Sequence, residues 1–237
     1  MPEPDVRAGG PPPFVIALDG PAASGKSTVG LGAARRLGFT YFDTGLLYRA
    51  LTWLALACGV APTDEAALVR LVDTLDDVEI DPLGHVARRG QDLTAHLHSP
   101  AVDANVSAVS AQPGVRRALV AVQRGLIRPP GLVMAGRDIG TVIVPDAPLK
   151  IWLVASAAER ARRRAAQTGA DEATVLAQML DRDRQDGSRA VAPMARAADA
   201  VSVDTDGVGP AQVIDRIVAL ALARGARPAG GAVADHT

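Results

Sequence analysis

The fold of this chain is decided by the stretch Gly20-Pro21-Ala22-Ala23-Ser24-Gly25-Lys26-Ser27-Thr28. The stretch fits the pattern G-x-x-x-x-G-K-[ST], the phosphate-binding loop of nucleotide-handling proteins. An apolar run at residues 14–18 comes directly before it and predicts a buried strand, and residues 29–37 predict a helix that ends near Gly38. Because the motif requires a strand, a loop and a helix in this order, a chance glycine-rich turn is disfavoured.

The residue types in this loop suit the binding of phosphate. Gly20 and Gly25 let the backbone wrap closely around phosphate oxygens, with its N–H groups pointing inward, and the helix N-terminus adds partial positive charge. Lys26 can reach the β- and γ-phosphates, and the hydroxyl of Ser27 can bind Mg²⁺. The loop predicts binding of a nucleoside triphosphate and leaves open which one.

Composition and charge exclude several classes of protein. A chain of 237 residues with 48% hydrophobic residues supports one large domain or a core with inserted subdomains. The net charge of −1 gives no argument for binding a nucleic acid polymer, and no apolar stretch is long enough to span a bilayer. Cys58 is the only cysteine, which indicates a reducing compartment. We expect a cytoplasmic monomer with no membrane or nucleic acid partner.

The order of predicted elements indicates an α/β fold with a parallel sheet. Strand-like and helix-like segments alternate along most of the chain, which implies right-handed crossovers with helices on both sides of the sheet. Three short strands with turns at 82–84 and 89–90 predict a small antiparallel insertion. The predicted strands are 14–18, 40–42, 131–135, 150–154 and 200–203, with 78–80, 85–87 and 91–93 in the insertion. The predicted helices are 29–38, 46–58, 63–75 capped by Thr63, 99–111, 113–126, one opened by a capping box at 156–159, 171–184 and 210–224.

Polar segments follow several of these elements and place charged side chains near the loop. In open α/β sheets, ligands bind outside the carboxyl ends of the strands. Two of the segments therefore bring Arg49, Arg137 and Asp138 close to the phosphate-binding loop. The third places several arginines in a polar connection that could close as a lid over phosphates. The segments are Asp43-Thr44-Gly45-Leu46-Leu47-Tyr48-Arg49, Gly136-Arg137-Asp138-Ile139-Gly140-Thr141 and Arg182-Asp183-Arg184-Gln185-Asp186-Gly187-Ser188-Arg189-Ala190-Val191-Ala192-Pro193.

With these segments, the chain closely resembles bacterial cytidylate kinases over about residues 15–222. The patterns Asp-[Ser/Thr]-Gly-x-x-Tyr-Arg, Gly-Arg-Asp-x-Gly-Thr and Asp-x-x-Arg-Ala-Val-x-Pro occur in the family's order and spacing. The resemblance implies a P-loop kinase core with a nucleoside-monophosphate-binding insertion at about 60–112 and a short lid at about 168–190. It also implies transfer of a phosphoryl group from ATP to CMP or dCMP with Mg²⁺. The domain would then span 14–224, and the Pro-, Gly- and Ala-rich ends at 1–13 and 225–237 are expected to be disordered.

The resemblance assigns five residues to the phosphate and the base of the acceptor nucleotide. Arg49 and Arg137 match arginines that bind the phosphate of CMP. Ser107, Arg116 and Asp138 match residues that contact cytosine. A carboxylate and a hydroxyl can accept the hydrogens of the cytosine amino group, whereas uracil presents a carbonyl oxygen there.

Further residues of the third segment match the family's sugar and lid contacts. Arg182 and Asp186 match residues near the sugar, and Arg189 matches a lid arginine that bridges the donor and acceptor phosphates. Thr44 stands where the family has Ser or Thr close to the acceptor nucleotide. Phosphoryl transfer needs positioning and charge neutralisation more than covalent help. We therefore expect catalysis from Lys26, Arg137, Arg182 and Arg189.

Two positions depart from the family's pattern. Ala135 stands where relatives often carry Asp or Glu, so we expect Asp138 or Asp19 to supply the second anchor of Mg²⁺ beside Ser27. Leu97-His98 stands where relatives often have Ile-Arg. A run of arginines at Arg160, Arg162, Arg163 and Arg164 is interpreted as a solvated helix face.

Other functions remain open on the residues alone. A GTPase-type switch or non-catalytic nucleotide-binding module is disfavoured because the chain has no Asn-Lys-x-Asp guanine-reading element. A different small-molecule kinase could use the same core with UMP, AMP, shikimate or dephospho-coenzyme A. The set Ser107, Arg116 and Asp138 favours cytosine among these acceptors.

Overall fold

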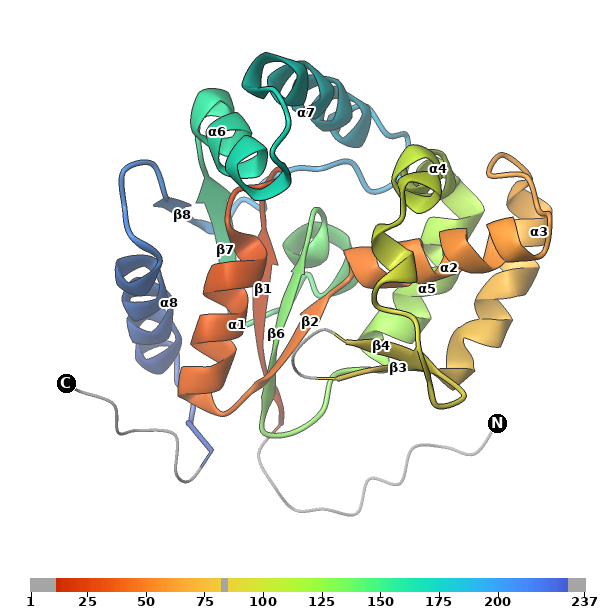
Figure 1. Ribbon diagram of the computed structural model, residues 1–237. Helices are drawn as coiled ribbons and strands as arrows, with labels where there is room; N and C mark the ends of the chain where they lie inside the picture. The colour runs from red at the N-terminus through yellow and green to blue at the C-terminus, as the bar shows by residue number, and fades with distance from the viewer. Residues whose placement is uncertain (1–11, 82–84, 230–237) are drawn as a thin grey trace.

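The structure, a computed structural model, describes residues 12–81 and 85–229. Its centre is a five-stranded parallel sheet in the order β2-β6-β1-β7-β8 (Figure 1). The phosphate-binding loop follows the middle strand, β1. This architecture confirms the predicted α/β fold. The strand bounds are β1 Phe14–Asp19, β2 Thr40–Asp43, β6 Gly131–Gly136, β7 Leu149–Val154 and β8 Val201–Asp204.

Helices cover both faces of the sheet because its central strand is apolar on both sides. Val15 and Ala17 pack into one hydrophobic cluster, and Ile16 and Leu18 pack into the other. Since successive side chains of a strand point to opposite faces, a continuous apolar run buries both. Helices α1 and α8 cover one face, and α2 to α5 cover the other (Figure 1). The helix bounds are α1 Lys26–Leu37, α2 Gly45–Ala57, α3 Glu65–Val72, α4 Pro100–Ala111, α5 Pro113–Arg124 and α8 Pro210–Ala223.

The predicted antiparallel insertion lies between α3 and α4. It is a three-stranded sheet in the order β3-β4-β5, in which both strand pairs are antiparallel. Val86 and Leu93 anchor it to the core formed by α2 to α5. The turn predicted at 82–84 lies outside the described residues. The bounds are β3 Val78–Ile80, β4 Val86–Arg88 and β5 Gln91–Asp92.

Two helices, α6 Ala157–Thr168 and α7 Glu172–Gly187, pack on each other above the carboxyl ends of the strands (Figure 1). Helix α7 lies within the region predicted as a lid, about 168–190, whereas α6 precedes it, and the lid itself stays a prediction. Helix α7 runs three residues beyond the predicted end at Arg184, so Asp186 lies on a helix and not in a connection. Its last turn is held by contacts with other segments, because the Asp186 side chain pairs with Arg137 and Arg189 and its carbonyl accepts from the Met194 N–H.

The predicted cap of one helix is wrong, and the predicted capping box of another is only half formed. Asp64, not Thr63, caps α3 by accepting a hydrogen bond of 3.0 Å from the backbone N–H of Ala67, and α3 ends at Val72 before a 3₁₀ turn. Ser156 caps α6 as expected, accepting from the N–H of Glu159 at 3.2 Å. The reciprocal half of the predicted capping box is absent, because the N–H of Ser156 donates to Asp206.

The two ends of the chain are only partly described. Residues 1–11 and 230–237 lie outside the described residues, so the predicted tails and the domain bounds stay predictions. Within residues 12–81 and 85–229, no helix combines the length and apolar character that crossing a membrane requires.

Candidate active site

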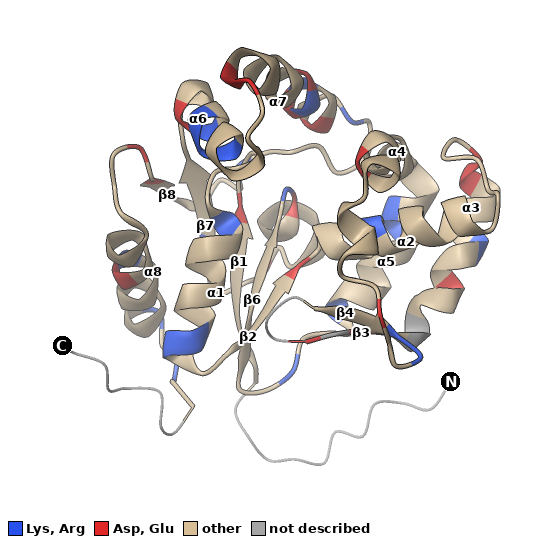
Figure 2. Cartoon of the chain, in the orientation of Figure 1, with Lys and Arg blue, Asp and Glu red and all other residues tan. Residues whose placement is uncertain are grey.

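The carboxyl ends of β1, β2 and β6 open into a cavity of about 1120 Å³. Of the residues predicted to form the site, all but Gly20 and Pro21 line this cavity, and those two contribute backbone carbonyls just beneath it. Basic residues from the end of β6, the phosphate-binding loop, α2, α5, α6 and α7 line this cavity, and Figure 2 marks their positions along the chain. The lining residues from the prediction are Ala22, Ala23, Ser24, Gly25, Lys26, Ser27, Thr28, Thr44, Arg49, Ser107, Arg116, Arg137, Asp138, Arg182, Asp186 and Arg189.

The phosphate-binding loop takes the backbone shape that its glycines permit. Gly25 has φ of 92° directly before α1, in the left-handed region that side chains disfavour. At Gly20 a Cβ would lie 2.8 Å from the backbone oxygen of Leu153, so a larger residue would push the loop off β7. Lys26 begins α1 and donates to the carbonyls of Gly20 at 2.8 Å and Pro21 at 2.6 Å. The loop thus encloses its own lysine.

Lys26 is a buried cation, which makes it sensitive to a nearby anion. Burial lowers the pKa of its amine well below the usual value, and Arg137 lowers it further. Lys26 forms no ion pair with the residues that the structure describes, and a buried positive charge of this kind favours a phosphate placed beside it. The position at the helix N-terminus adds to that preference.

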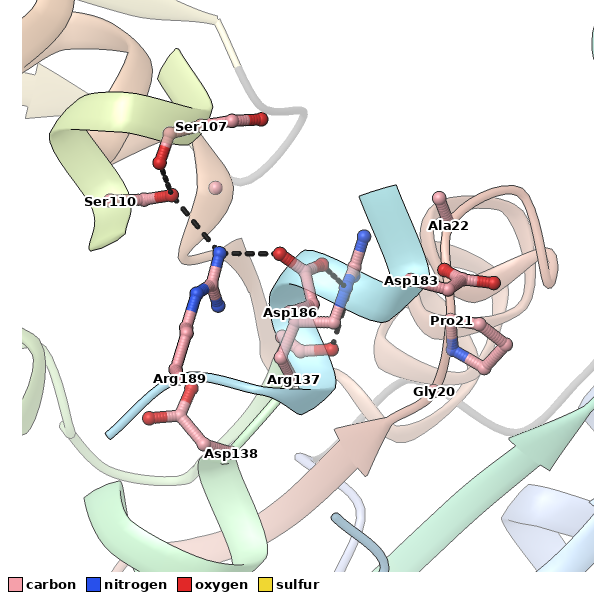
Figure 3. Close-up of polar contacts among 12 residues, drawn as sticks. Gly20, Pro21, Ala22, Ser107, Ser110, Arg137, Asp138, Asp183, Asp186 and Arg189 are labelled. Carbon is pink, nitrogen blue, oxygen red and sulfur yellow. Dashed lines mark hydrogen bonds and ion pairs between the residues drawn. The ribbon is translucent and has the colours of Figure 1, made fainter. Parts of the chain in front are cut away.

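A chain of ion pairs joins the end of β6 to the lid. The carboxylate of Asp186 accepts from Arg137 Nε at 3.0 Å, and its other oxygen pairs with Arg189 Nη2. Figure 3 shows these two arginines on either side of Asp186, with Arg189 reaching on to Ser110. Asp186 is 3% exposed, so the two arginines share a buried anion.

Arg182 adds a further guanidinium group to this cluster. Its Nε is buried and has no hydrogen-bond partner among the described residues. Burial, with Arg137 as the next cause, lowers the pKa of Arg182. Arg182 also lines the cavity, so its guanidinium group adds positive charge where an anionic ligand would bind.

Arg116 and Asp138 form a second buried pair beside the first cluster. Arg116 Nη2 donates to Asp138 Oδ2 at 2.7 Å, and the two side chains are 4% and 7% exposed. Arg116 also donates from Nη1 to the carbonyl of Ser110 at 3.1 Å, and its guanidinium lies 5.4 Å from the centre of the Tyr48 ring. Among the described residues, no hydrogen bond uses the other oxygen of Asp138, and Ser107 on α4 lines the same cavity.

Arg49 occupies the outer side of the cavity. It donates to the carbonyl of Leu97 at 2.8 Å and to Asp103 at 2.7 Å. Leu97 itself is fully buried in the core, whereas His98 lines the cavity. Burial, and after it Arg49, lowers the pKa of His98. The Leu97-His98 departure from the family pattern therefore lies directly at the predicted acceptor side.

The turn after β6 is held by Asp19. Its carboxylate accepts from the N–H groups of Ile139 at 2.9 Å and Gly140 at 2.8 Å. At Gly136 a Cβ would lie 2.7 Å from Thr44 Oγ1, so the strand end and Thr44 pack without space for a side chain. This turn carries Arg137 and Asp138 into the cavity, and it is a role for Asp19 that the sequence prediction missed.

The carboxylate nearest to Ser27 is Asp43, not Asp138 or Asp19. Ser27 Oγ donates to Asp43 Oδ2 at 3.4 Å, while the other oxygen of Asp43 accepts from the Gly45 N–H at 2.9 Å. Asp19 spends both oxygens on the backbone and Asp138 is paired with Arg116. The role of Asp138 or Asp19 as the second anchor therefore stays a prediction, and the Ser27 hydroxyl and the Asp43 carboxylate form an oxygen donor set that fits Mg²⁺.

One arginine of the predicted solvated face is buried. Arg160 is 5% exposed and donates to the carbonyl of Ala22 at 3.1 Å while pairing with Asp183 at 2.7 Å. It therefore ties α6 and α7 to the phosphate-binding loop, and Figure 3 shows Asp183 beside that loop. Arg162 is exposed as predicted, and Arg163 is partly buried against Thr205. The four arginines are thus not one face.

Comparison with known proteins identifies the family. A family model described as Cytidylate kinase matches residues 16–223. This chain belongs to the cytidylate kinase family. The predicted family is confirmed, and with it the prediction that the chain is a kinase of the P-loop type.

Individual relatives are similar in sequence to most of this chain. It is 44% identical to the Cytidylate kinase of Symbiobacterium thermophilum, covering 86% of this chain and 94% of that one. It is 46% identical to the Cytidylate kinase of Mycobacterium avium, covering 86% of this chain and 92% of that one. A Bifunctional pantoate ligase/cytidylate kinase of Synechococcus elongatus is 47% identical over 89% of this chain, which spans only 42% of that protein's length.

Proposed function

We propose that this chain transfers the γ-phosphoryl group of ATP to CMP or dCMP, giving ADP and CDP or dCDP. The observation that carries the proposal is the cluster of Arg137, Arg182 and Arg189 above the phosphate-binding loop, in which Arg137 and Arg189 share the carboxylate of Asp186. Such a surplus of guanidinium charge fits the acceptor phosphate and the transferred phosphoryl group together. Family membership supports the same reaction.

The donor side follows from the loop. We assign the triphosphate of ATP to the backbone N–H groups of residues 20–28 and to the Lys26 amine, which would exchange the carbonyls of Gly20 and Pro21 for phosphate oxygens. Ser27, with Asp43 beside it, would hold Mg²⁺ and its water shell. When bound, Mg²⁺ neutralises charge on the β- and γ-phosphates. Lys26 supplies a fixed positive charge at the same place, in a buried site where it is worth more than in water.

The acceptor side divides between phosphate and base. Arg49, Arg137 and Arg182 would neutralise and orient the CMP phosphate, whose oxygen is itself the nucleophile. Arg189, on the segment after α7, would stabilise the charge that develops between donor and acceptor. We propose that the sugar of the acceptor lies near Arg182 and Asp186, and that Thr44 lies close to the acceptor nucleotide.

The pair Arg116–Asp138 and the Ser107 hydroxyl are assigned to the cytosine. The ion pair fixes the Asp138 carboxylate so that its second oxygen can accept from the cytosine amino group. Arg116 can donate to the base oxygen and ring nitrogen. A uracil oxygen facing Asp138 would leave two acceptors opposed in a buried site, which is costly.

The deciding experiment measures ADP formation from ATP with CMP, dCMP, UMP or AMP as acceptor, with and without Mg²⁺. We expect turnover with CMP and dCMP that depends on Mg²⁺ and exceeds the rates with UMP and AMP. Faster turnover with UMP or AMP would assign the site to a different monophosphate kinase. No acceptor-dependent turnover would indicate a non-catalytic nucleotide-binding module. Sedimentation analysis of the same sample tests the proposed monomer, and fractionation of cells tests the cytoplasmic location.

A further inference from the structure

Ser110 is a buried residue at the point where the acceptor side meets the lid. It lies in the last turn of α4, one residue before the helix ends at Ala111, and is 7% exposed. Its hydroxyl accepts from Arg189 Nη2 at 3.1 Å and lies 3.2 Å from the carbonyl of Ser107, to which it donates (Figure 3). It is therefore a direct contact of α4 with the segment that follows α7.

The geometry at Arg189 is fixed by the two partners of one nitrogen. Both Ser110 Oγ and Asp186 Oδ1 accept from Nη2. Among the described residues, no hydrogen bond uses Arg189 Nε or Nη1. Since a guanidinium group is planar, holding one nitrogen from two sides sets the direction of the other two. Those two remain for a phosphoryl group in the cavity.

The end of α4 is itself held in place. The last carbonyls of a helix have no partner within the helix, and the Ser110 carbonyl is satisfied by Arg116 Nη1. The Ser110 hydroxyl therefore projects from a fixed helix end and not from a fraying one. Burial lowers the pKa of Arg189, so its guanidinium lies in a poorly solvated place where a hydrogen bond to it is strong.

We propose that Ser110 is a positioning residue, which orients the Arg189 guanidinium so that Nε and Nη1 face the phosphoryl group during transfer. The proposal rests on the assignment of Arg189 under the proposed function. It predicts that the hydroxyl acts on the rate of transfer more than on nucleotide binding, because its two hydrogen bonds go to Arg189 and to the Ser107 carbonyl.

The test compares kcat and both KM values of Ser110→Ala, Ser110→Thr and wild type. We expect Ser110→Ala to lower kcat about tenfold, the effect of losing one hydrogen bond to a charged group, with KM for ATP and the acceptor within about twofold. Ser110→Thr keeps a hydroxyl and should recover most of the rate. Ser188→Ala is the matched control. Ser188 directly precedes Arg189, but its exposed hydroxyl donates to the Gln185 carbonyl and does not contact the Arg189 side chain. It should leave kcat unchanged.

A double-mutant cycle separates positioning from a merely structural role. In an Arg189→Ala background, Ser110→Ala should cause no further loss, because the group on which it acts is gone. Losses that multiply in the double variant, or a Ser110→Ala variant with unchanged kcat, would overturn the proposal. The kcat of each variant is compared with that of the wild type on whichever monophosphate the wild type phosphorylates best. A wild type that does not phosphorylate CMP would therefore refute the proposed substrate without deciding the role of Ser110.

Discussion

Replacing Asp138 by alanine would leave the Arg116 guanidinium buried without its carboxylate. The two side chains are 4% and 7% exposed and their atoms lie 2.7 Å apart, so little water can replace the lost partner. Removing one member of a buried ion pair typically costs about 3–5 kcal/mol of stability. Arg116 keeps the Ser110 carbonyl and the face of the Tyr48 ring, which offset part of the loss. We expect the free energy of unfolding to fall by about 3 kcal/mol.

The same substitution should change the choice of base. Without Asp138 the site loses an acceptor for the cytosine amino group and no longer opposes the uracil oxygen. We expect kcat/KM for CMP to fall and the CMP/UMP ratio to narrow by about tenfold or more. Stability is measured by urea unfolding, and the ratio by steady-state kinetics at a temperature where the variant is folded.

A double variant distinguishes the two effects of Asp138. The double variant Arg116→Met with Asp138→Leu leaves no buried charge without a partner, so it should recover most of the lost stability. It should still lack the preference for CMP over UMP. A loss below about 1 kcal/mol in Asp138→Ala would contradict the buried pair. Equal losses of kcat/KM with CMP and UMP would show that Asp138 serves the arginine cluster and does not read the base.

Three further predictions concern Lys26 and Asp43 on the donor side and Asp19, which holds the turn after β6. Lys26→Ala should lower kcat/KM by roughly 10²–10³-fold, the range for one charge that stabilises a transition state, while circular dichroism shows a folded protein; near-normal ADP formation would refute the loop assignment. Asp43→Asn keeps an acceptor for the Gly45 N–H but loses the negative charge beside Ser27. The Mg²⁺ concentration that gives half-maximal activity should therefore rise several-fold, and an unchanged concentration would place the metal elsewhere. Burial raises the pKa of Asp19 from 3.8 to about 6, although the Gly140 and Ile139 N–H groups lower it. The folded state thus holds a proton that the unfolded chain releases, and stability should fall by up to about 3 kcal/mol as pH rises from about 4 to about 6. In Asp19→Asn this contribution disappears, so urea unfolding of both proteins at several pH values should give a difference that varies with pH; a constant difference would contradict the raised pKa.

Much of the fold was predictable because it depends on local signals. The loop from Gly20 to Thr28 sets its own backbone shape, and alternating strands and helices leave few topologies. Arg137 and Asp138 could be placed near Lys26 because the carboxyl ends of parallel strands meet at one edge of the sheet. The roles of these residues stay predictions until the variants are measured.

The remaining features depend on contacts between distant segments. Arg160 and Arg162 look alike in the sequence, and only the packing of α7 decides that Arg160 meets Asp183. The last turn of α7 is likewise held by Arg137, 49 residues away from Asp186. A carboxylate next to an arginine-rich stretch gives no sign of which guanidinium groups it will bind.

If the proposed function holds, Asp186 would help the site to distinguish a nucleotide from its nucleoside. Its carboxylate balances the mutual repulsion of Arg137 and Arg189 and keeps both within the cavity. A ligand that recruits these arginines must attract them more strongly than one carboxylate does. A dianionic phosphate meets that condition, whereas a nucleoside offers only hydroxyl groups and leaves the arginines with Asp186. The last turn of α7 thus acts as a charge threshold, so that free cytidine would be a weak competitor however well its base fits.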